Sequence, residues 1–167
     1  MEDSCTKIHV SADFGIIHSM VVHFPIAFLS LAFLVDVLAL ILRQRHGRFF
    51  DRAGFWVVTL ALFGFMVAIM TGKAAEHFIP HTSQVRSVVR RHELDALITA
   101  ALTAMAWIVQ ALTRFDAQSA ESDYAWSVAN TGRGRVTPLS ILLITAAVVM
   151  MIFTAAHGGA LVHRYKV

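Results

Sequence analysis

Four long apolar stretches constrain what this chain of 167 residues can fold into, and they lie at about 20–42, 55–72, 94–112 and 139–157. About 20 apolar residues in a helix cross the roughly 30 Å hydrocarbon core of a bilayer. A helix is favoured because it satisfies its backbone hydrogen bonds within one segment. The sequence therefore predicts an all-α integral membrane four-helix bundle, with antiparallel neighbours and both termini on the same side.

Composition agrees with a membrane protein, because 57% of the residues are hydrophobic and only 15% are charged, against about a quarter charged in soluble domains. The lipid bilayer is thus an expected partner. The net charge of +3 comes from arginines in short loops rather than from a basic tract, so nucleic acid is not expected to bind. The single cysteine, Cys5, excludes an internal disulfide and an iron–sulfur cluster held by several thiolates.

The chain is expected to form one membrane domain over residues 1–167. Residues 1–19 are interpreted as a polar N-terminal segment, the segment between 72 and 93 as interfacial, and 114–138 as a flexible loop. Gly64, Ala68 and Gly72 recur every four residues, which favours close approach of a neighbouring helix.

Histidines are distributed unevenly about the predicted membrane, because only His46 falls on the side opposite the termini. Lysines and arginines divide evenly, seven on each side. Four arginines between residues 43 and 52 favour a cytoplasmic first loop in the cytoplasmic (inner) membrane, with the histidine-rich face on the periplasmic side. The eight histidines on the terminus side are His9, His18, His23, His77, His81, His92, His157 and His163.

The third stretch carries one polar stripe, which is expected to face the bundle interior because polar side chains are costly in lipid. Its members are His92, Asp95, Thr99, Thr103 and Gln110.

Histidines near one membrane face suggest a site for haem b, since haem in a helical bundle takes axial imidazoles from different helices. The candidate ligands are His23, His92 and His157, with His18 as an alternative. His18 and His23 lie about 140° apart on a continuous helix, and we expect His23 to face the bundle and His18 the surface. The alternative is that these imidazoles cap helix ends and form hydrogen bonds at the membrane interface.

A metal ion is the alternative cofactor, because His77 and His81 are four residues apart with Glu76 beside them. Pro80 argues against a regular helix there. Asp36 and Asp95 are interpreted as structural polar residues. Asp36 would pair with Arg52 or bond Thr59, with a proton path or quinone contact as the functional alternative. The methionines Met66, Met70, Met105, Met150 and Met151 are interpreted as ordinary core.

Two motifs resemble those of a bacterial membrane family catalogued as domain of unknown function 2231. They are His18 followed by His23-Phe24-Pro25-Ile26-Ala27, and Gly158-Gly159-Ala160-Leu161-Val162-His163-Arg164. Ser19 stands where the family usually has proline, His163 replaces its tyrosine, and Lys166 interrupts its glycine-rich finish. The resemblance implies a four-helix membrane domain, and fusion of some relatives to Rieske or cytochrome c domains suggests redox work by association.

The sequence favours a membrane electron-transfer subunit over a stand-alone enzyme, with a quinone or a soluble redox protein as its electron partner. A non-catalytic anchor or assembly subunit, bound to other membrane subunits or to copies of itself, is the first alternative. A metal-binding or transport protein is the second, and no inverted repeat is evident to support transport.

Overall fold

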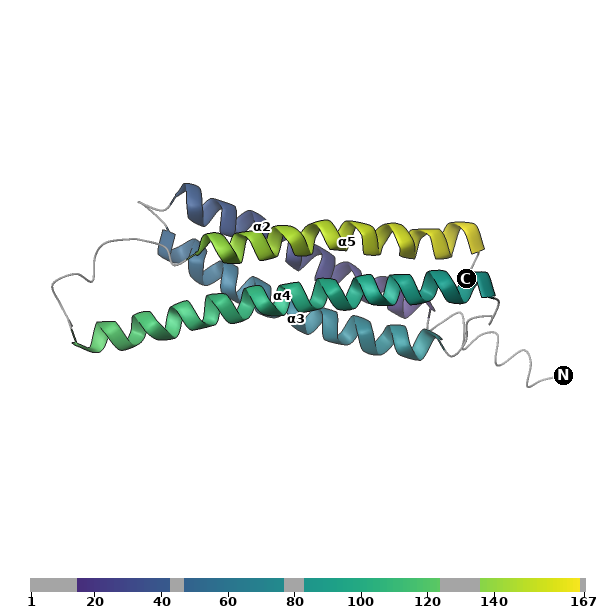
Figure 1. Cartoon of the computed structure of the whole chain (residues 1–167), viewed down its shortest axis with the longest axis horizontal. Helices are drawn as coiled ribbons and strands as arrows, with labels where there is room; N and C mark the ends of the chain where they lie inside the picture. The colour runs from purple at the N-terminus through teal and green to yellow at the C-terminus, as the bar shows by residue number, and fades with distance from the viewer. Residues whose placement is uncertain (1–14, 43–46, 77–82, 124–135, 166–167) are drawn as a thin grey trace.

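In the computed structural model the described residues are 15–42, 47–76, 83–123 and 136–165. Helical residues 15–21 lead into the first labelled helix, and no strand occurs in these ranges. The four helices are α2 (His23–Ile41), α3 (Gly47–Glu76), α4 (Ser83–Asp123) and α5 (Pro138–Tyr165) (Figure 1).

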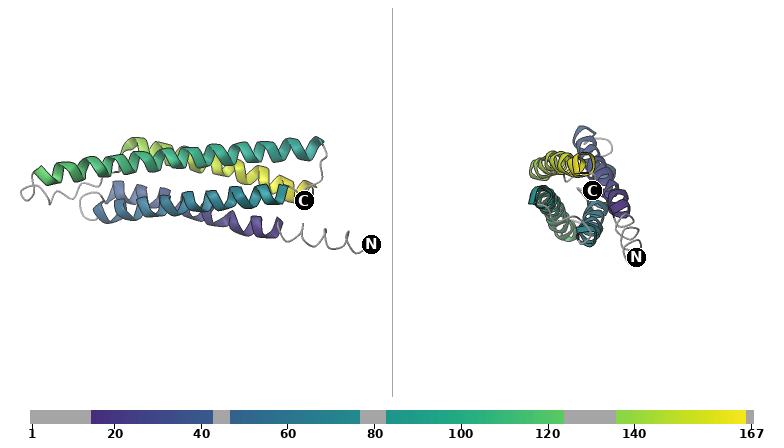
Figure 2. Two further views of the ribbon diagram at one scale, coloured as in Figure 1. Left: turned by 90° about the horizontal axis from the view of Figure 1, so that it is seen from below. Right: turned by 90° about the vertical axis from the view of Figure 1, so that its right-hand side faces the viewer.

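The helices form an antiparallel ring in which each one packs against its two neighbours, as the end-on view of Figure 2 shows. The tightest packing is within the pairs α2–α3 and α4–α5. The beginnings of α2 and α4 and the ends of α3 and α5 lie at one end of the bundle, so the predicted antiparallel bundle is confirmed (Figure 1).

The helices extend beyond the apolar stretches that predict them. Residues 83–93, interpreted as interfacial, form the first turns of α4, which begins at Ser83, and residues 114–123 of the expected loop are helical as well. Hydropathy marks only the part that suits lipid, whereas backbone hydrogen bonding continues into polar turns. The candidate membrane spans are Gly15–Ile41, Phe49–Glu76, Ser83–Arg114 and Pro138–Gly159.

The middle of the bundle is an apolar layer in which four fully buried alanines lie among larger side chains such as Leu29, Phe65 and Ile144, and we call it the alanine layer. It takes one fully buried alanine from each helix, namely Ala32, Ala61, Ala106 and Ala147. Small residues allow helix backbones to approach closely, which is how helices in lipid gain packing energy. The layer is apolar and separates two polar clusters, one at each end of the bundle.

The small-residue face of α3 packs as the sequence predicts. A Cβ atom built at Gly64 would lie 3.2 Å from Pro25 Cδ, and one at Gly72 would lie 3.0 Å from His18 Cε1. Ala68, between them, is buried. The small residues of α3 are therefore those that pack against the helical segment containing His18 and Pro25.

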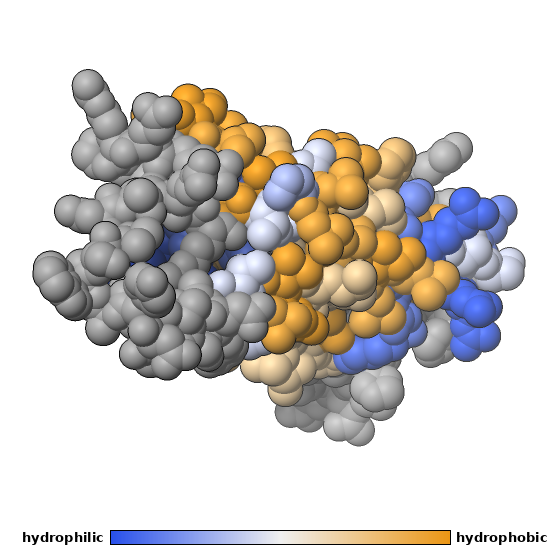
Figure 3. Space-filling model, turned by 60° about the vertical axis from the view of Figure 1, so that its left-hand side comes forward, coloured by the Kyte–Doolittle hydropathy of each residue, from blue (hydrophilic) through white to orange (hydrophobic). Residues whose placement is uncertain are grey.

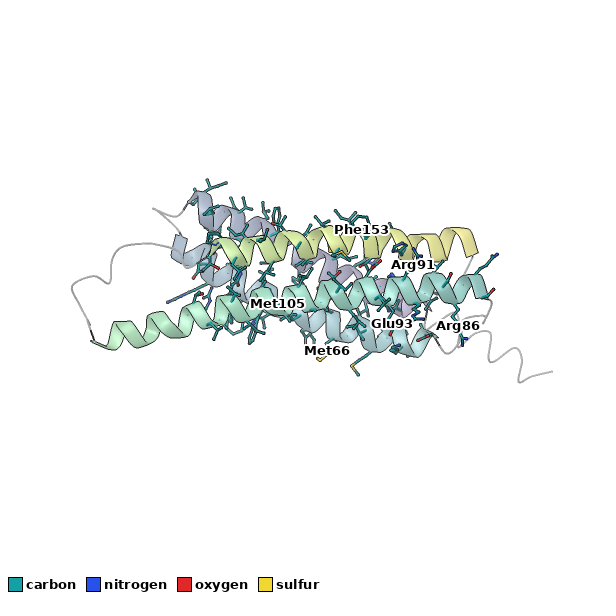
Figure 4. All side chains as sticks on the ribbon, in the orientation of Figure 1. Met66, Arg86, Arg91, Glu93, Met105 and Phe153 are labelled. Atoms are coloured by element: carbon teal, nitrogen blue, oxygen red, sulfur yellow. The ribbon has the colours of Figure 1, made fainter. Side chains whose placement is uncertain are left out.

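Large apolar side chains cover the outside of the bundle, where Figure 3 shows them as a continuous band on one face. Met66, Met105 and Phe153, labelled in Figure 4, are 52%, 52% and 54% exposed. The core interpretation is therefore wrong for Met66, Met70 and Met105, although Met151 is buried. In a membrane these outer side chains contact lipid, so their exposure carries no hydrophobic penalty.

Candidate functional site

Three histidines from three helical segments lie at the end of the bundle where α2 and α4 begin. We call His18, His92 and His157 the histidine cluster. All three side chains are partly buried. His18 precedes α2, His92 lies in α4 and His157 lies in α5, so the cluster depends on the tertiary fold and not on one sequence motif.

His18 faces α3 through a hydrogen bond of 3.1 Å between its Nδ1 atom and Thr71 Oγ1. The Thr71 hydroxyl has one hydrogen, which it directs to the carbonyl oxygens of Val67 and Ala68 at 3.1 Å each. The threonine oxygen must then accept from the ring, so His18 donates from Nδ1.

His92 reaches from α4 to α5, where its Nδ1 atom lies 2.9 Å from the carbonyl oxygen of Thr154. A carbonyl only accepts, so His92 also donates from Nδ1. The same ring lies 3.1 Å from the Cβ position that a side chain at Gly158 would occupy. It also interacts electrostatically with His18 on the other side of the bundle.

His157 makes the reciprocal connection from α5 to α4, with its Nδ1 atom 2.6 Å from Asp95 Oδ2. Thr99 and Thr154 meet at 3.4 Å between the same two helices. Asp95 is therefore confirmed as part of the interior polar stripe, along with the buried side chains Thr99, Thr103 and Gln110.

The three rings share one hydrogen-bonding pattern. The hydrogen bonds that join the rings to Thr71, to the Thr154 carbonyl and to Asp95 all use Nδ1, and His18 has a further hydrogen bond with the backbone of Ala68. A neutral imidazole that donates from Nδ1 keeps its lone pair on Nε2. Histidines that ligate metals commonly have this second hydrogen bond, which fixes the ring and raises its basicity. Sequence reasoning missed the partners Thr71 and Thr154.

His23 lies apart from the cluster. Its side chain is exposed, and its Nδ1 atom lies 2.6 Å from the carbonyl oxygen of Ser19 on the preceding turn. The expected orientations are therefore reversed, with His18 facing the bundle and His23 facing outward. The cause is the packing of His18 and Pro25 against Gly72 and Gly64, which sets the rotation of this helix.

The histidine pair expected to hold a metal, His77 and His81, lies outside the described residues. Within the described ranges no group of three histidine, cysteine, aspartate or glutamate side chains is arranged to hold a metal ion. The cluster thus brings imidazoles near one another without forming a compact metal cage.

The second polar cluster, which we call the aspartate cluster, lies beyond the alanine layer and contains Asp36, Asp51, Gln110 and Arg114. Gln110 Nε2 donates to Asp36 Oδ2 at 2.8 Å. The expected partners of Asp36 are wrong, because Arg52 is exposed and the Thr59 hydroxyl donates to the carbonyl of Phe55.

Aromatic side chains close this end of the bundle. Phe55 and Trp107 stack with ring centroids 5.7 Å apart, and Trp107 Nε1 donates to Thr59 Oγ1 at 2.9 Å. The Arg114 guanidinium lies 4.5 Å from the centre of the Phe55 ring and 3.3 Å from Asp51 Oδ2. Arg114 also donates to the Asp51 backbone carbonyl.

Four membrane-length helices around an apolar layer, with a polar cluster at each end, define a multi-pass helical-bundle membrane protein. The chain belongs to the family described as "Predicted membrane protein (DUF2231)", whose model matches residues 16–167. This match confirms the resemblance drawn from the motifs. No curated protein and no solved structure matches the chain.

Proposed function

We propose that the protein is an electron-carrying membrane subunit that binds haem b through the histidine cluster. The observation that supports this proposal is that each of the three rings forms a hydrogen bond through Nδ1. The Nε2 atom would then be the atom that binds the haem iron. Two imidazoles would be enough to hold a low-spin haem b, whereas a bare metal ion is usually held by three or four protein ligands.

His18 and His92 are the favoured axial pair. Their rings interact electrostatically across the bundle and pack directly against Gly72 and Gly158. His157 is the reserve ligand, oriented by Asp95. His23 has its ring at the outer surface and is not needed for this proposal.

The bound haem would supply one-electron chemistry. The chain's own residues would hold the ligand rings, since the Thr71 hydroxyl and the Thr154 carbonyl fix their orientation. The buried apolar core in the middle of the bundle would keep the cofactor at the histidine end. We place the histidine cluster near the periplasmic face of the inner membrane, where a quinone or a soluble redox protein would exchange electrons with it.

Visible absorption of the protein, purified after expression with haem available, tests this function. We expect a Soret band with the paired bands of a low-spin haem in the reduced state. His18→Ala and His92→Ala should each abolish or shift this spectrum. His23→Ala is the matched control, because it removes an exposed imidazole from the same helix five residues away and should leave the spectrum unchanged.

Two results would count against the proposal. Protein that folds and shows no Soret band is not a haem carrier, and a membrane subunit that copurifies with it would then favour the anchor function. A band that survives all three of His18→Ala, His92→Ala and His157→Ala would show that haem binds elsewhere.

A further inference from the structure

The aspartate cluster holds a carboxyl group inside a membrane span with very little to balance its charge. Asp36 is 1% exposed and Gln110 is 3% exposed. Among the described residues, the charged groups that interact with Asp36 are Asp51 on α3 and Arg114 on α4. Arg114 is already engaged by the carboxylate and backbone carbonyl of Asp51. The described side chains of the cluster thus contain two carboxyl groups and one cation.

The carboxyl group of Asp36 also has few hydrogen-bond partners among the described residues. Its Oδ2 atom accepts from Gln110, but its Oδ1 atom is buried without a partner among the described residues, and so is Gln110 Oε1. An ionised carboxylate in an apolar interior needs several donors or a dedicated cation to offset its desolvation. One amide donor is too little, whereas a protonated carboxyl group is neutral and also supplies a donor of its own.

Gly54 fills the space beside the unpartnered oxygen. A Cβ atom at Gly54 would overlap Asp36 Oδ1, so the backbone of α3 lies directly against that oxygen. A sodium ion would need several oxygen ligands around it, and the α3 backbone occupies this side of the carboxyl group. A proton needs no such space.

We propose that Asp36 is a proton-binding site, and that it exchanges its proton with water at the end of the bundle where α2 ends and α3 begins. Gln110 suits both protonation states, because its NH₂ group donates to the carboxylate and its oxygen accepts from the carboxylic acid after the amide turns over. Asp36 is five residues from the end of α2 at Ile41, about 8 Å by helical rise. This proposal is independent of haem, because the two clusters lie at opposite ends of the bundle.

Labelling with dicyclohexylcarbodiimide tests the site in the full-length protein in lipid vesicles. This apolar reagent adds to a protonated carboxyl group in the membrane and rearranges to a stable N-acylurea, so the peptide gains the mass of one whole reagent. We expect peptide mass mapping of the unmutated protein to place the adduct on Asp36 at acidic pH. The labelled fraction should fall about tenfold per pH unit once the group titrates. Asp36→Asn should abolish it.

The matched control is Glu93→Gln, which removes an exposed carboxyl group that is paired with Lys73 and should leave labelling of Asp36 unchanged. Absence of an adduct on Asp36 at acidic pH in the unmutated protein would overturn the proposal, and so would labelling that does not change with pH. Suppression of the adduct by sodium ions at constant pH would also overturn it, since the site would then hold a metal cation. The unmutated protein decides each of these outcomes, so the test does not depend on whether Asp36→Asn folds.

Discussion

The two ends of the bundle solve the same problem, polar side chains inside a membrane protein, in different ways. In the histidine cluster each ring is oriented by a hydrogen bond through its Nδ1 atom. In the aspartate cluster an arginine, a carboxylate and two stacked aromatic rings fit together around Asp36 and Gln110. The first arrangement suits ligand binding, whereas the second suits stability together with storage of a proton. Variants at the two ends should therefore differ in how much they cost the fold.

The largest effect on stability is expected from Arg114→Met. This change removes a cation that pairs with the carboxylate of Asp51 at 3.3 Å and contacts the Phe55 ring, and breaking a buried ion pair costs about 3 kcal/mol or more. The midpoint of unfolding in a titration of denaturing detergent measures it. Arg52→Met is the control, because Arg52 is exposed on the neighbouring position of α3. Equal losses for the two variants would contradict a structural role for the Asp51–Arg114 pair.

A smaller loss is expected from Trp107→Phe, which keeps the stacking on Phe55 but removes the indole N–H that donates to Thr59. The cost of one such hydrogen bond is about 1 kcal/mol. Trp56→Phe provides the comparison, since the Trp56 side chain is 64% exposed on the outer surface of the bundle. If Trp56→Phe destabilises the protein as much as Trp107→Phe, the hydrogen bond from Trp107 to Thr59 does not account for the loss of stability.

The smallest effect is expected at the histidine end, from Lys73→Met. Lys73 is paired with Glu76 and Glu93, and all three side chains are accessible to solvent. Exposed ion pairs contribute little, and salt screens them. Unfolding curves of the variant and the unmutated protein should overlay at high salt. A clear loss that persists at high salt would show that the histidine end also depends on charge pairing for its stability.

The fold could be predicted from sequence because lipid imposes a simple rule on it. Length and hydropathy determine the number of spans, and the periodic stripe of Thr99, Thr103 and Gln110 correctly predicts which face of α4 is buried. The ends of the helices could not be predicted in this way, since polar helical turns outside the membrane resemble loops in composition.

The orientation of His18 was predictable from its spacing to Asp36, although the nearby motif of His23 and Pro25 suggests the opposite orientation. His18 and Asp36 are 18 residues apart, which is five full turns of an α-helix. A carboxyl group within a span must face the interior, and that requirement places His18 on the interior face as well. The partner of Asp36 was less accessible, because only the tertiary structure brings Gln110 to it in preference to Arg52 or Thr59.

The alanine layer separates two titratable clusters along the length of the bundle, so a voltage across the membrane acts on them differently. By helical rise, the 18 residues between His18 and Asp36 correspond to about 27 Å along the helix axis, with the buried apolar core between them. A unit charge that moves through the full membrane voltage changes in energy by about 2.3 kcal/mol per 100 mV. The two clusters therefore lie at different electrical potentials when a voltage is applied across the membrane. A change of that voltage would favour positive charge at one cluster and oppose it at the other.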